Sequence, residues 1–316
     1  MQLTSNSQAF IEAEQYSAFI LLNLHDGLLP ESFYRNVSDF GSGTTLHIKT
    51  VGTATLQEAS EDTPLIYNPI ESGTVTMQIT DYVGDAWYVT DDLRENGTQV
   101  EQLMAARSAE STRALQEVFE SRFLKTANDA QTDANANTIN GFAHRIAAAS
   151  TGETMELAHL IAMKLAFDKA NVPSEGRIFI VDPIVEATLN TLVTITTDVT
   201  PFAAAILETG MARGQKFLMN LYGWDIMTSN RLDKGSFGDG TSTVSAGVAN
   251  LFMCVLDDQT KPIMQAWRRL PKAEGERNKD RARDEFVVRA RWGFGAQRVD
   301  TLGVLIVDDS TYVYAA

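Results

Sequence analysis

Cysteine and long apolar runs are nearly absent from this sequence, and each absence excludes a class of protein. Cys254 is the only cysteine among the 316 residues, so an intramolecular disulfide is excluded and synthesis in a reducing cytoplasm is expected. No run of eighteen or more apolar residues occurs, so no membrane-spanning segment is predicted. The first residues carry neither a basic start nor an apolar core, and they predict no secretory signal.

Recognisable catalytic and metal-binding patterns are also missing. The sequence contains no Gly-x-Ser-x-Gly elbow and no phosphate-binding P-loop. Residues 133–144 begin like a calcium-binding loop, but Thr138 replaces the glycine and His144 replaces the final glutamate. Four histidines are scattered without metal-ligand spacing: His25, His47, His144 and His159. We therefore predict no catalytic, cofactor-binding or metal-binding residue, and no cofactor.

Basic residues are scarce, and their distribution is uneven. The chain has 26 Lys and Arg against 41 Asp and Glu, a net charge of −15. Residues 1–100 are strongly acidic, whereas residues 268–291 carry nine basic and five acidic side chains. The net charge argues against tight phosphate binding by a free subunit. This separation of acidic and basic segments along the chain favours head-to-tail contacts between copies. For residues 277–284 alone, a solvated charged loop is an equal alternative.

A long polar hairpin is predicted in the first third of the chain. Residues 44–51 and 74–80 alternate apolar and polar side chains, as half-buried strands do. About twenty residues between them are rich in Thr, Glu, Ser, Asp and Pro, so they cannot form a core of their own. We expect this hairpin to find its burial on a neighbouring copy, which favours a shell subunit over an enzyme.

One long helix follows a further predicted strand at residues 86–90. Thr98 is a suitable N-cap, and Glu101 completes a capping box. No Gly or Pro interrupts residues 99–128, which predicts a helix of about 45 Å. Apolar residues at three- and four-residue spacings predict one buried stripe: Val100, Leu103, Met104, Leu115, Val118, Phe119 and Phe123.

The second half of the chain mixes helices and strands, which indicates the α+β class. After a polar linker at 129–140, helices are predicted at 155–170, from 182 onward and at 202–211. Strands are predicted at 176–181, 223–228, 251–256, 284–292 and 299–307, with a mobile loop at 234–247. The tryptophans fall in or beside these strands, where core packing explains them: Trp87, Trp224, Trp267 and Trp292.

Several segments, in this order, resemble the major capsid proteins of tailed bacteriophages, which are built on the Hong Kong 97 fold. They are Thr50-Val-Gly-Thr-Ala54, Asp81 to Asp92, the helix 99–128, the Asn-Val-Pro and Gly-Arg passage in 169–183, Gly223 to Asn230, and Arg289 to Val307. No single segment is highly specific, but the match covers nearly the whole chain.

The resemblance implies an α+β Hong Kong 97-like fold with five parts. These are an N-terminal arm (1–40), an extended β-hairpin loop with its return strand (41–95), a long spine helix in a peripheral domain (96–150), an axial domain (151–267), and a C-terminal return to the peripheral domain (268–316). The implied function is that of a major capsid protein, not an enzyme, whose pentamers and hexamers form an icosahedral shell around double-stranded DNA. An encapsulin-like nanocompartment shell protein is the alternative, and a soluble hydrolase would require a converging polar pocket.

The resemblance also implies the partners and the location. The expected partners are other copies of the chain, a separate scaffolding protein, a portal, a possible decoration protein, and packaged DNA in weak non-specific contact, with no membrane. Assembly in the host cytoplasm and residence in the virion are expected. Some relatives form a covalent bond through a lysine of the loop, but Lys49 lies at the base of this loop, so non-covalent stabilisation is expected.

Ion pairs between subunits are the candidate contacts. The acidic candidates lie on the extended loop: Glu58, Glu61, Asp62 and Glu71. The basic candidates lie on the long helix and in the C-terminal basic region: Arg107, Arg113, Arg122, Arg268, Arg269, Arg289 and Arg291. Each exposed pair contributes only about 0–1 kcal/mol, so many pairs acting together matter more than any one of them.

Overall fold

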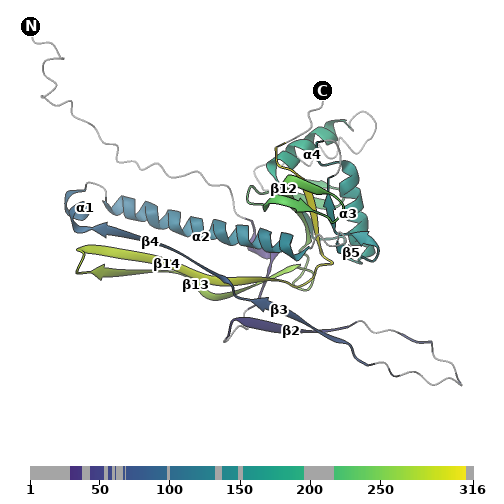
Figure 1. Cartoon of the computed structure of the whole chain (residues 1–316), viewed down its shortest axis with the longest axis horizontal. Helices are drawn as coiled ribbons and strands as arrows, with labels where there is room; N and C mark the ends of the chain where they lie inside the picture. The colour runs from purple at the N-terminus through teal and green to yellow at the C-terminus, as the bar shows by residue number, and fades with distance from the viewer. Residues whose placement is uncertain are drawn as a thin grey trace, which may run out of the picture.

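The computed structural model describes residues 29–37, 43–52, 56–58, 61, 67, 69–97, 100–131, 137–148, 152–195 and 217–310. It has three visible parts: a long helix lying on a narrow sheet, a compact body at one end of that helix, and a hairpin that extends away from both (Figure 1). Most of the expected N-terminal arm, Thr98 and the expected helix at 202–211 lie outside the described residues.

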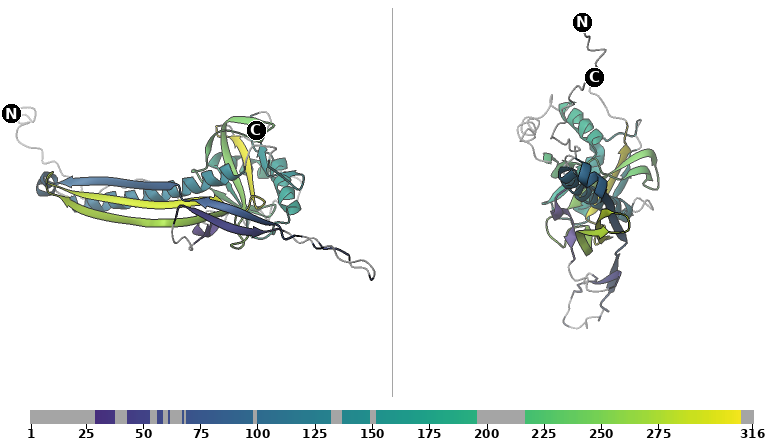
Figure 2. Two further views of the ribbon diagram at one scale, coloured as in Figure 1. Left: turned by 60° about the horizontal axis from the view of Figure 1, so that its bottom comes forward. Right: turned by 90° about the vertical axis from the view of Figure 1, so that its left-hand side faces the viewer.

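A single helix, α2 (Val100–Ala130), runs the length of the narrow sheet (Figures 1 and 2). Its 31 residues span about 46 Å, close to the predicted helix. Leu115 and Phe123 are buried as predicted, but Leu103 is 49% exposed, so that part of the predicted stripe is wrong. The reason is that the large apolar partners lie under the C-terminal half of α2, where Phe119 stacks on Trp267 at 4.9 Å. None of the described helices is long and apolar enough to cross a membrane.

The narrow sheet has four strands in the order β1-β13-β14-β4. Their bounds are β1 (Arg35–Asn36), β4 (Asp81–Thr90), β13 (Ile263–Asn278) and β14 (Arg283–Ala296). A short helix, α1 (Asp91–Asn96), follows β4, and the Thr90 hydroxyl accepts a hydrogen bond from Leu93 N at 3.4 Å. This side-chain cap ends the strand and starts the helix.

Residues 277–284 do not form the solvated loop that was considered as an alternative, because they belong to the hairpin of β13 and β14. Strand pairing continues to Asn278 opposite Arg283, so only residues 279–282 form the turn. The dense charge obscured β13 in the sequence, because one face of this sheet and its far end are open to solvent and tolerate charged side chains. The backbone ladder, not apolar alternation, defines this strand.

The compact body contains a seven-stranded sheet in the order β7-β15-β12-β8-β10-β9, with β11 paired to β12. The strands are β7 (Arg145–Ala147), β8 (Arg177–Val181), β9 (Phe217–Leu221), β10 (Trp224–Thr228), β11 (Lys234–Gly238), β12 (Thr243–Cys254) and β15 (Leu302–Asp308). A separate small hairpin, β5 (Thr138–Ile139) with β6 (Phe142–Ala143), follows α2.

Helices cover both faces of the seven-stranded sheet. Helices α3 (Leu157–Lys169) and α4 (Pro183–Ile195) pack on one face, in a core that includes Phe179 stacked on Phe252. The C-terminal end of α2 packs on the other face through Phe123 and Leu124. Strand residues therefore alternate between two apolar cores, which explains why β8 is buried throughout. Cys254 is fully buried in this sheet, as predicted.

One prediction about the C-terminal half is wrong. The expected mobile loop at 234–247 is a β-hairpin of β11 and β12, closed by Asp239, whose carboxylate accepts hydrogen bonds from the amides of Thr241 and Ser242. The segment from residue 268 onward, expected to return to the peripheral domain, forms β14 of the four-stranded sheet and then β15 of the seven-stranded sheet, which pairs with β12 and β7. Both faces of β15 are buried, one in each apolar core.

The extended hairpin consists of β2 (Thr45–Val51), β3 (Ser72–Gln78) and the residues between them. The two strands pair from Thr45 opposite Gln78 to Val51 opposite Ser72, as the sequence pattern predicted. Its base is held by Met77, which packs on Met264, while a Cβ on Gly293 would collide with the backbone of Gln78. Glycine is therefore required where the hairpin crosses β14.

Candidate assembly surfaces

The extended hairpin carries exposed acids and exposed apolar side chains beyond its paired strands. Glu58, Glu61 and Glu71 are all exposed, whereas Asp62 lies outside the described residues. Three apolar side chains in the same part of the hairpin are almost fully accessible: Leu56 is 95% exposed, Tyr67 98% and Ile70 84%. The acids were predicted as contacts from the sequence and these three were not, although large apolar residues isolated in a polar stretch are visible in a sequence.

The three arginine candidates on α2 have acidic partners in their own chain. Arg107 lies 2.8 Å from the Asp85 carboxylate, and Arg122 lies 3.7 Å from Asp81. These two pairs join α2 to β4. Burial raises the pKa of Asp81, and the nearby Arg122 opposes that shift. Arg113 pairs with Glu117 one turn along the helix at 3.3 Å. Each of these arginines would have to share or exchange its partner to bind another subunit.

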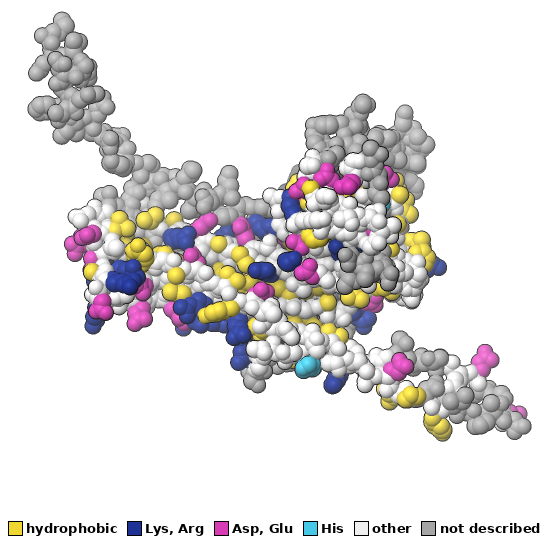
Figure 3. Space-filling model, in the orientation of Figure 1, with side chains coloured by type: hydrophobic (Ala, Val, Ile, Leu, Met, Phe, Trp, Pro, Cys, Tyr) yellow, Lys and Arg dark blue, Asp and Glu magenta, His cyan; other side chains and the backbone are white. Residues whose placement is uncertain are grey.

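The face of the four-stranded sheet opposite α2 carries a row of positive charges. Arg269 stands directly opposite Arg291, and Lys272 stands opposite Arg289. We call these four residues the basic stripe, and Figure 3 shows Lys and Arg side chains gathered along this part of the sheet. Glu274 lies 2.8 Å from Arg269, but neither Arg289 nor Arg291 forms an ion pair within the described ranges. Like charges placed opposite each other are destabilising, so the stripe favours an anionic partner.

Other basic residues of the C-terminal region are used within the chain. Arg277 donates to Asp91, with Nη2 2.6 Å from Oδ2, and also lies 3.2 Å from Asp284. These hydrogen bonds hold the pKa of Asp91 below its usual value. Arg94 adds a contact with Asp284 at 2.6 Å. This exposed network ties the end of the β13–β14 hairpin to α1. Arg268, the remaining candidate, is exposed on β13.

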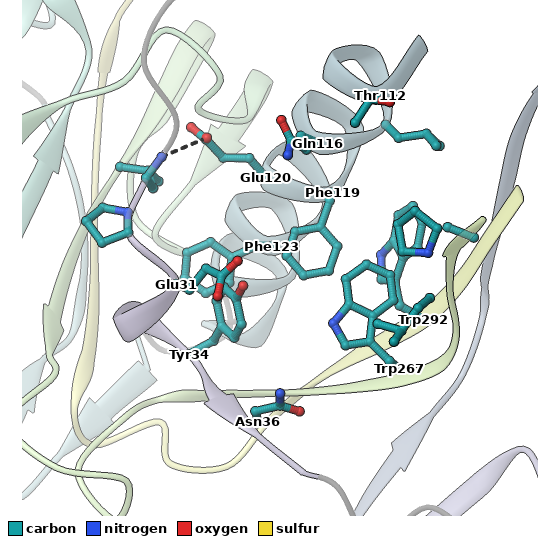
Figure 4. A pocket seen from close by; sticks show the side chains of 16 residues that line it. Glu31, Tyr34, Asn36, Thr112, Gln116, Phe119, Glu120, Phe123, Trp267 and Trp292 are labelled. Carbon is teal, nitrogen blue, oxygen red and sulfur yellow. Dashed lines mark hydrogen bonds between the residues drawn. The ribbon is translucent and has the colours of Figure 1, made fainter. Parts of the chain in front are cut away.

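A buried glutamate joins α2 to the segment that leads into β1 and to the segment that follows β10. Glu120 on α2 accepts hydrogen bonds from Leu29 N and from the Ser229 hydroxyl, both at 3.0 Å. Figure 4 shows the bond to Leu29. Arg231 lies 3.5 Å from Glu120 and 3.0 Å from Glu117. Glu120 was not predicted from the sequence, because a glutamate in a long charged helix resembles an ordinary solvent-facing residue.

A groove lined by aromatic rings lies between α2, the four-stranded sheet and the segment that contains β1 (Figure 4). Its volume is about 500 Å³. We call it the aromatic groove and define it by five lining residues: Tyr34, Phe119, Trp267, Leu270 and Trp292. Burial, with a smaller contribution from the Glu31 carboxylate, raises the pKa of Tyr34 to about 12, so its phenol stays neutral. The tryptophans were expected only to pack a core.

The described part of the chain holds no group of three or more His, Cys, Asp or Glu side chains arranged to bind a metal. Two histidines have structural surroundings instead. His159 Nδ1 accepts a hydrogen bond from Glu156 N at the start of α3, and His144 stacks on Phe167. Burial lowers the pKa of both imidazoles, which favours their neutral forms.

A comparison with known protein families assigns this chain to one of them. Residues 72–307 match the model of the family described as phage capsid protein. The chain belongs to the phage capsid protein family. The matched range runs from β3 to β15 and so includes α2, the seven-stranded sheet and all of the four-stranded sheet except β1. A search of curated proteins found no match in sequence.

Solved structures of capsids share the fold of this phage capsid protein. The mature capsid of bacteriophage PhiM1 aligns with a TM-score of 0.72 and 13% identity, covering 98% of this chain and 95% of that chain. Mycobacterium phage Che8 gives 0.64 and 18%, covering 93% and 96%. The holo-SrpI encapsulin complex from Synechococcus elongatus gives 0.59 and 12%, covering 100% and 99%.

These findings confirm the Hong Kong 97-like fold and the function inferred from the sequence. The protein is a major capsid protein, a structural component of the virion that assembles with copies of itself into a shell. The encapsulin shares only the fold at 12% identity, whereas the family model decides for the phage capsid protein. The exposed surfaces described above therefore belong to a protein whose working state is an assembly.

Proposed function

We propose that this capsid protein forms pentamers and hexamers of an icosahedral shell around double-stranded DNA, and that the extended hairpin of each copy lies across its neighbour. One observation carries this proposal: the extended hairpin projects beyond the body that it belongs to (Figure 1), with acidic and apolar side chains fully open to solvent. Such a projection gains little from its own chain, and a neighbouring copy would supply the missing burial.

The proposed ionic contacts join Glu58, Glu61 and Glu71 to the basic stripe of the next copy. Arg289 and Arg291 are the preferred partners, because their positive charges face other cations rather than carboxylates. Arg107, Arg113 and Arg122 are weaker choices because each has an acid beside it already. Any single exposed pair contributes about 0–1 kcal/mol, and a closed shell repeats the pairs many times.

We also propose an assignment of the domains and of the assembly partners. The proposed peripheral domain is built on α2 and the four-stranded sheet, and the proposed axial domain on the seven-stranded sheet. We expect no enzymatic activity. A scaffolding protein and a portal take part in assembly in the host cytoplasm. A decoration protein can bind the outer surface of the shell. The packaged DNA is contacted weakly, in keeping with the net charge of −15 of each subunit.

Removing the outer part of the extended hairpin tests this proposal. A variant lacking residues 58–68 should fold, because the residues of this stretch that the structure describes, Glu58, Glu61 and Tyr67, are exposed and belong to no core cluster, but it should not form closed particles. Circular dichroism would report the fold, and sedimentation velocity with negative-stain electron microscopy would report assembly. Normal closed particles from the shortened protein would overturn the role given to the hairpin.

A further inference from the structure

The aromatic groove is open where a partner could enter it. Leu270 on its rim is 65% exposed, and the Trp267 ring at its centre is only partly covered. A second hollow of about 450 Å³ shares Asn36, Trp267 and Leu270 with it and is also lined by Arg268. The two hollows are therefore neighbours, and a cation lines the second of them.

The interior of this groove also lacks a hydrogen-bond partner. Trp292 is fully buried, yet its indole N–H has no acceptor among the residues that the structure describes. A buried donor without an acceptor carries a free-energy cost, because it has lost its bond to water. A small turn of the Trp292 ring would let a carbonyl or hydroxyl oxygen that a partner brings into the groove accept this hydrogen bond.

The extended hairpin offers side chains that fit such a groove. Tyr67, Leu56 and Ile70 are the three most exposed large apolar side chains of the described residues. Tyr67 combines an aromatic ring with a hydroxyl, which suits an aromatic wall that contains an unpaired donor. Glu58 and Glu71 lie near these residues in the sequence and complement the charge of Arg268.

The hairpin does not lie against the groove of its own chain. Figures 1 and 2 show its strands, β2 and β3, leading away from α2, whereas the groove lies between α2 and the four-stranded sheet. The groove that Tyr67 fills must therefore belong to another copy.

We propose that Tyr67, flanked by Leu56 and Ile70, inserts into the aromatic groove of a neighbouring subunit. The inference rests on the proposed overlap of neighbouring copies and names the groove that receives it. One inserted side chain and its neighbours form a contact smaller than the roughly 1,200–2,000 Å² of a stable interface. The contact is therefore weak between two subunits and effective only when a shell repeats it.

A chemical cross-link between the two sites tests this insertion. The variant Tyr67→Cys/Leu270→Cys carries one thiol on the hairpin and one on the groove rim, and the natural Cys254 is fully buried and protected. Assembled particles would be treated with a short bis-maleimide and analysed on a denaturing gel. Each chain links to two neighbours, so a ladder of dimers, trimers and larger oligomers is expected.

Matched variants separate the possible failures. Tyr67→Cys/Leu256→Cys places the second thiol on a residue of similar type, 47% exposed, beyond the end of β12, and should give no ladder. If particles form normally but the Leu270→Cys variant gives no ladder, the proposed insertion of Tyr67 into the groove is wrong. The same conclusion follows if the Leu256→Cys variant gives the same ladder. Either result would leave the proposed shell function intact. If the wild-type protein formed no particles, the proposed function itself would fail. Tyr67→Asp should slow assembly at least tenfold with an unchanged melting temperature of the free subunit, and an unchanged assembly rate would also overturn the insertion.

Discussion

The backbone N–H of Leu29 donates a hydrogen bond to the buried carboxylate of Glu120, 3.0 Å away. The other oxygen of that carboxylate accepts a hydrogen bond from the Ser229 hydroxyl and lies 3.5 Å from Arg231. One side chain of α2 therefore fixes the segment that leads into β1 and the segment that follows β10. A rigid junction at this point sets the angle between the long helix and the compact body, which a regular shell requires.

Replacing this glutamate should loosen the junction. We expect Glu120→Ala to lower the free energy of unfolding by about 2–4 kcal/mol, because it leaves buried donors unpaired and deprives Arg231 of one of its two carboxylates. Urea unfolding of the free subunit, followed by circular dichroism, measures the change. Gln102→Ala, at an exposed position of the same helix, is the control and should stay within about 0.5 kcal/mol of wild type. Equal free energies of unfolding for the two variants would show that the contacts of Glu120 contribute little to stability.

The basic stripe should show opposite effects on folding and on assembly. Arg291→Gln removes one cation facing Arg269, so the free subunit should be unchanged or more stable by about 0.2–1 kcal/mol. Assembly should be slower, because the proposed site for a neighbour's carboxylates is weakened. Light scattering at several salt concentrations measures the assembly rate.

A control for the stripe lies on the same hairpin. Lys279→Gln removes the same charge in the turn between β13 and β14, away from the four facing residues, and should assemble like wild type. Added salt should slow the wild type more than Arg291→Gln, since salt screens exposed charges. Identical rates and salt responses in all three proteins would remove the stripe from the assembly mechanism.

Acid should release the end of the β13–β14 hairpin from α1. The pKa of Asp91 is lower in the folded protein than in the unfolded chain, because Arg277 donates to its carboxylate. Its contribution to stability is therefore present above the unfolded pKa of about 3.9 and is lost as pH falls through the lower folded value. The protection factors of the Asp91–Asn96 amides, which correct the exchange rates for their intrinsic dependence on pH, should fall in that window. In Asp91→Asn the protection should already be low at neutral pH, and a wild-type protection that is lost above pH 5 would contradict this assignment.

Sequence patterns were reliable where one physical signal dominated. The alternation at 44–51 and the uninterrupted stretch after Val100 led to the correct hairpin and helix, because strand and helix periods differ clearly. The pattern failed for β13, where charges on an open sheet face hid the strand, and for β11, where glycines suggested a loop. Both strands are defined by backbone pairing with the strand that follows them in the chain, β14 and β12, and backbone pairing leaves no trace in the side-chain pattern when charges or glycines break the alternation.

The candidate site was less predictable than the fold. Charges are visible in a sequence, so the acids of the hairpin and the cations of β13 and β14 could be proposed as contacts from the sequence, and they remain a prediction. The aromatic groove required the fold, because Tyr34, Phe119 and Trp267 come from three segments far apart in the chain. The same holds for Glu120, whose burial depends on contacts with Leu29 and Ser229. The intrachain partners of Arg107 and Arg122 also became visible only in three dimensions.

The most direct test is an electron cryomicroscopy reconstruction of particles assembled from the wild-type protein. The account predicts closed particles in which the hairpin of each subunit crosses to the next subunit and Tyr67 lies between Trp267 and Leu270 of that neighbour. A protein that stays monomeric at every concentration, or particles in which each hairpin folds back onto its own chain, would contradict it.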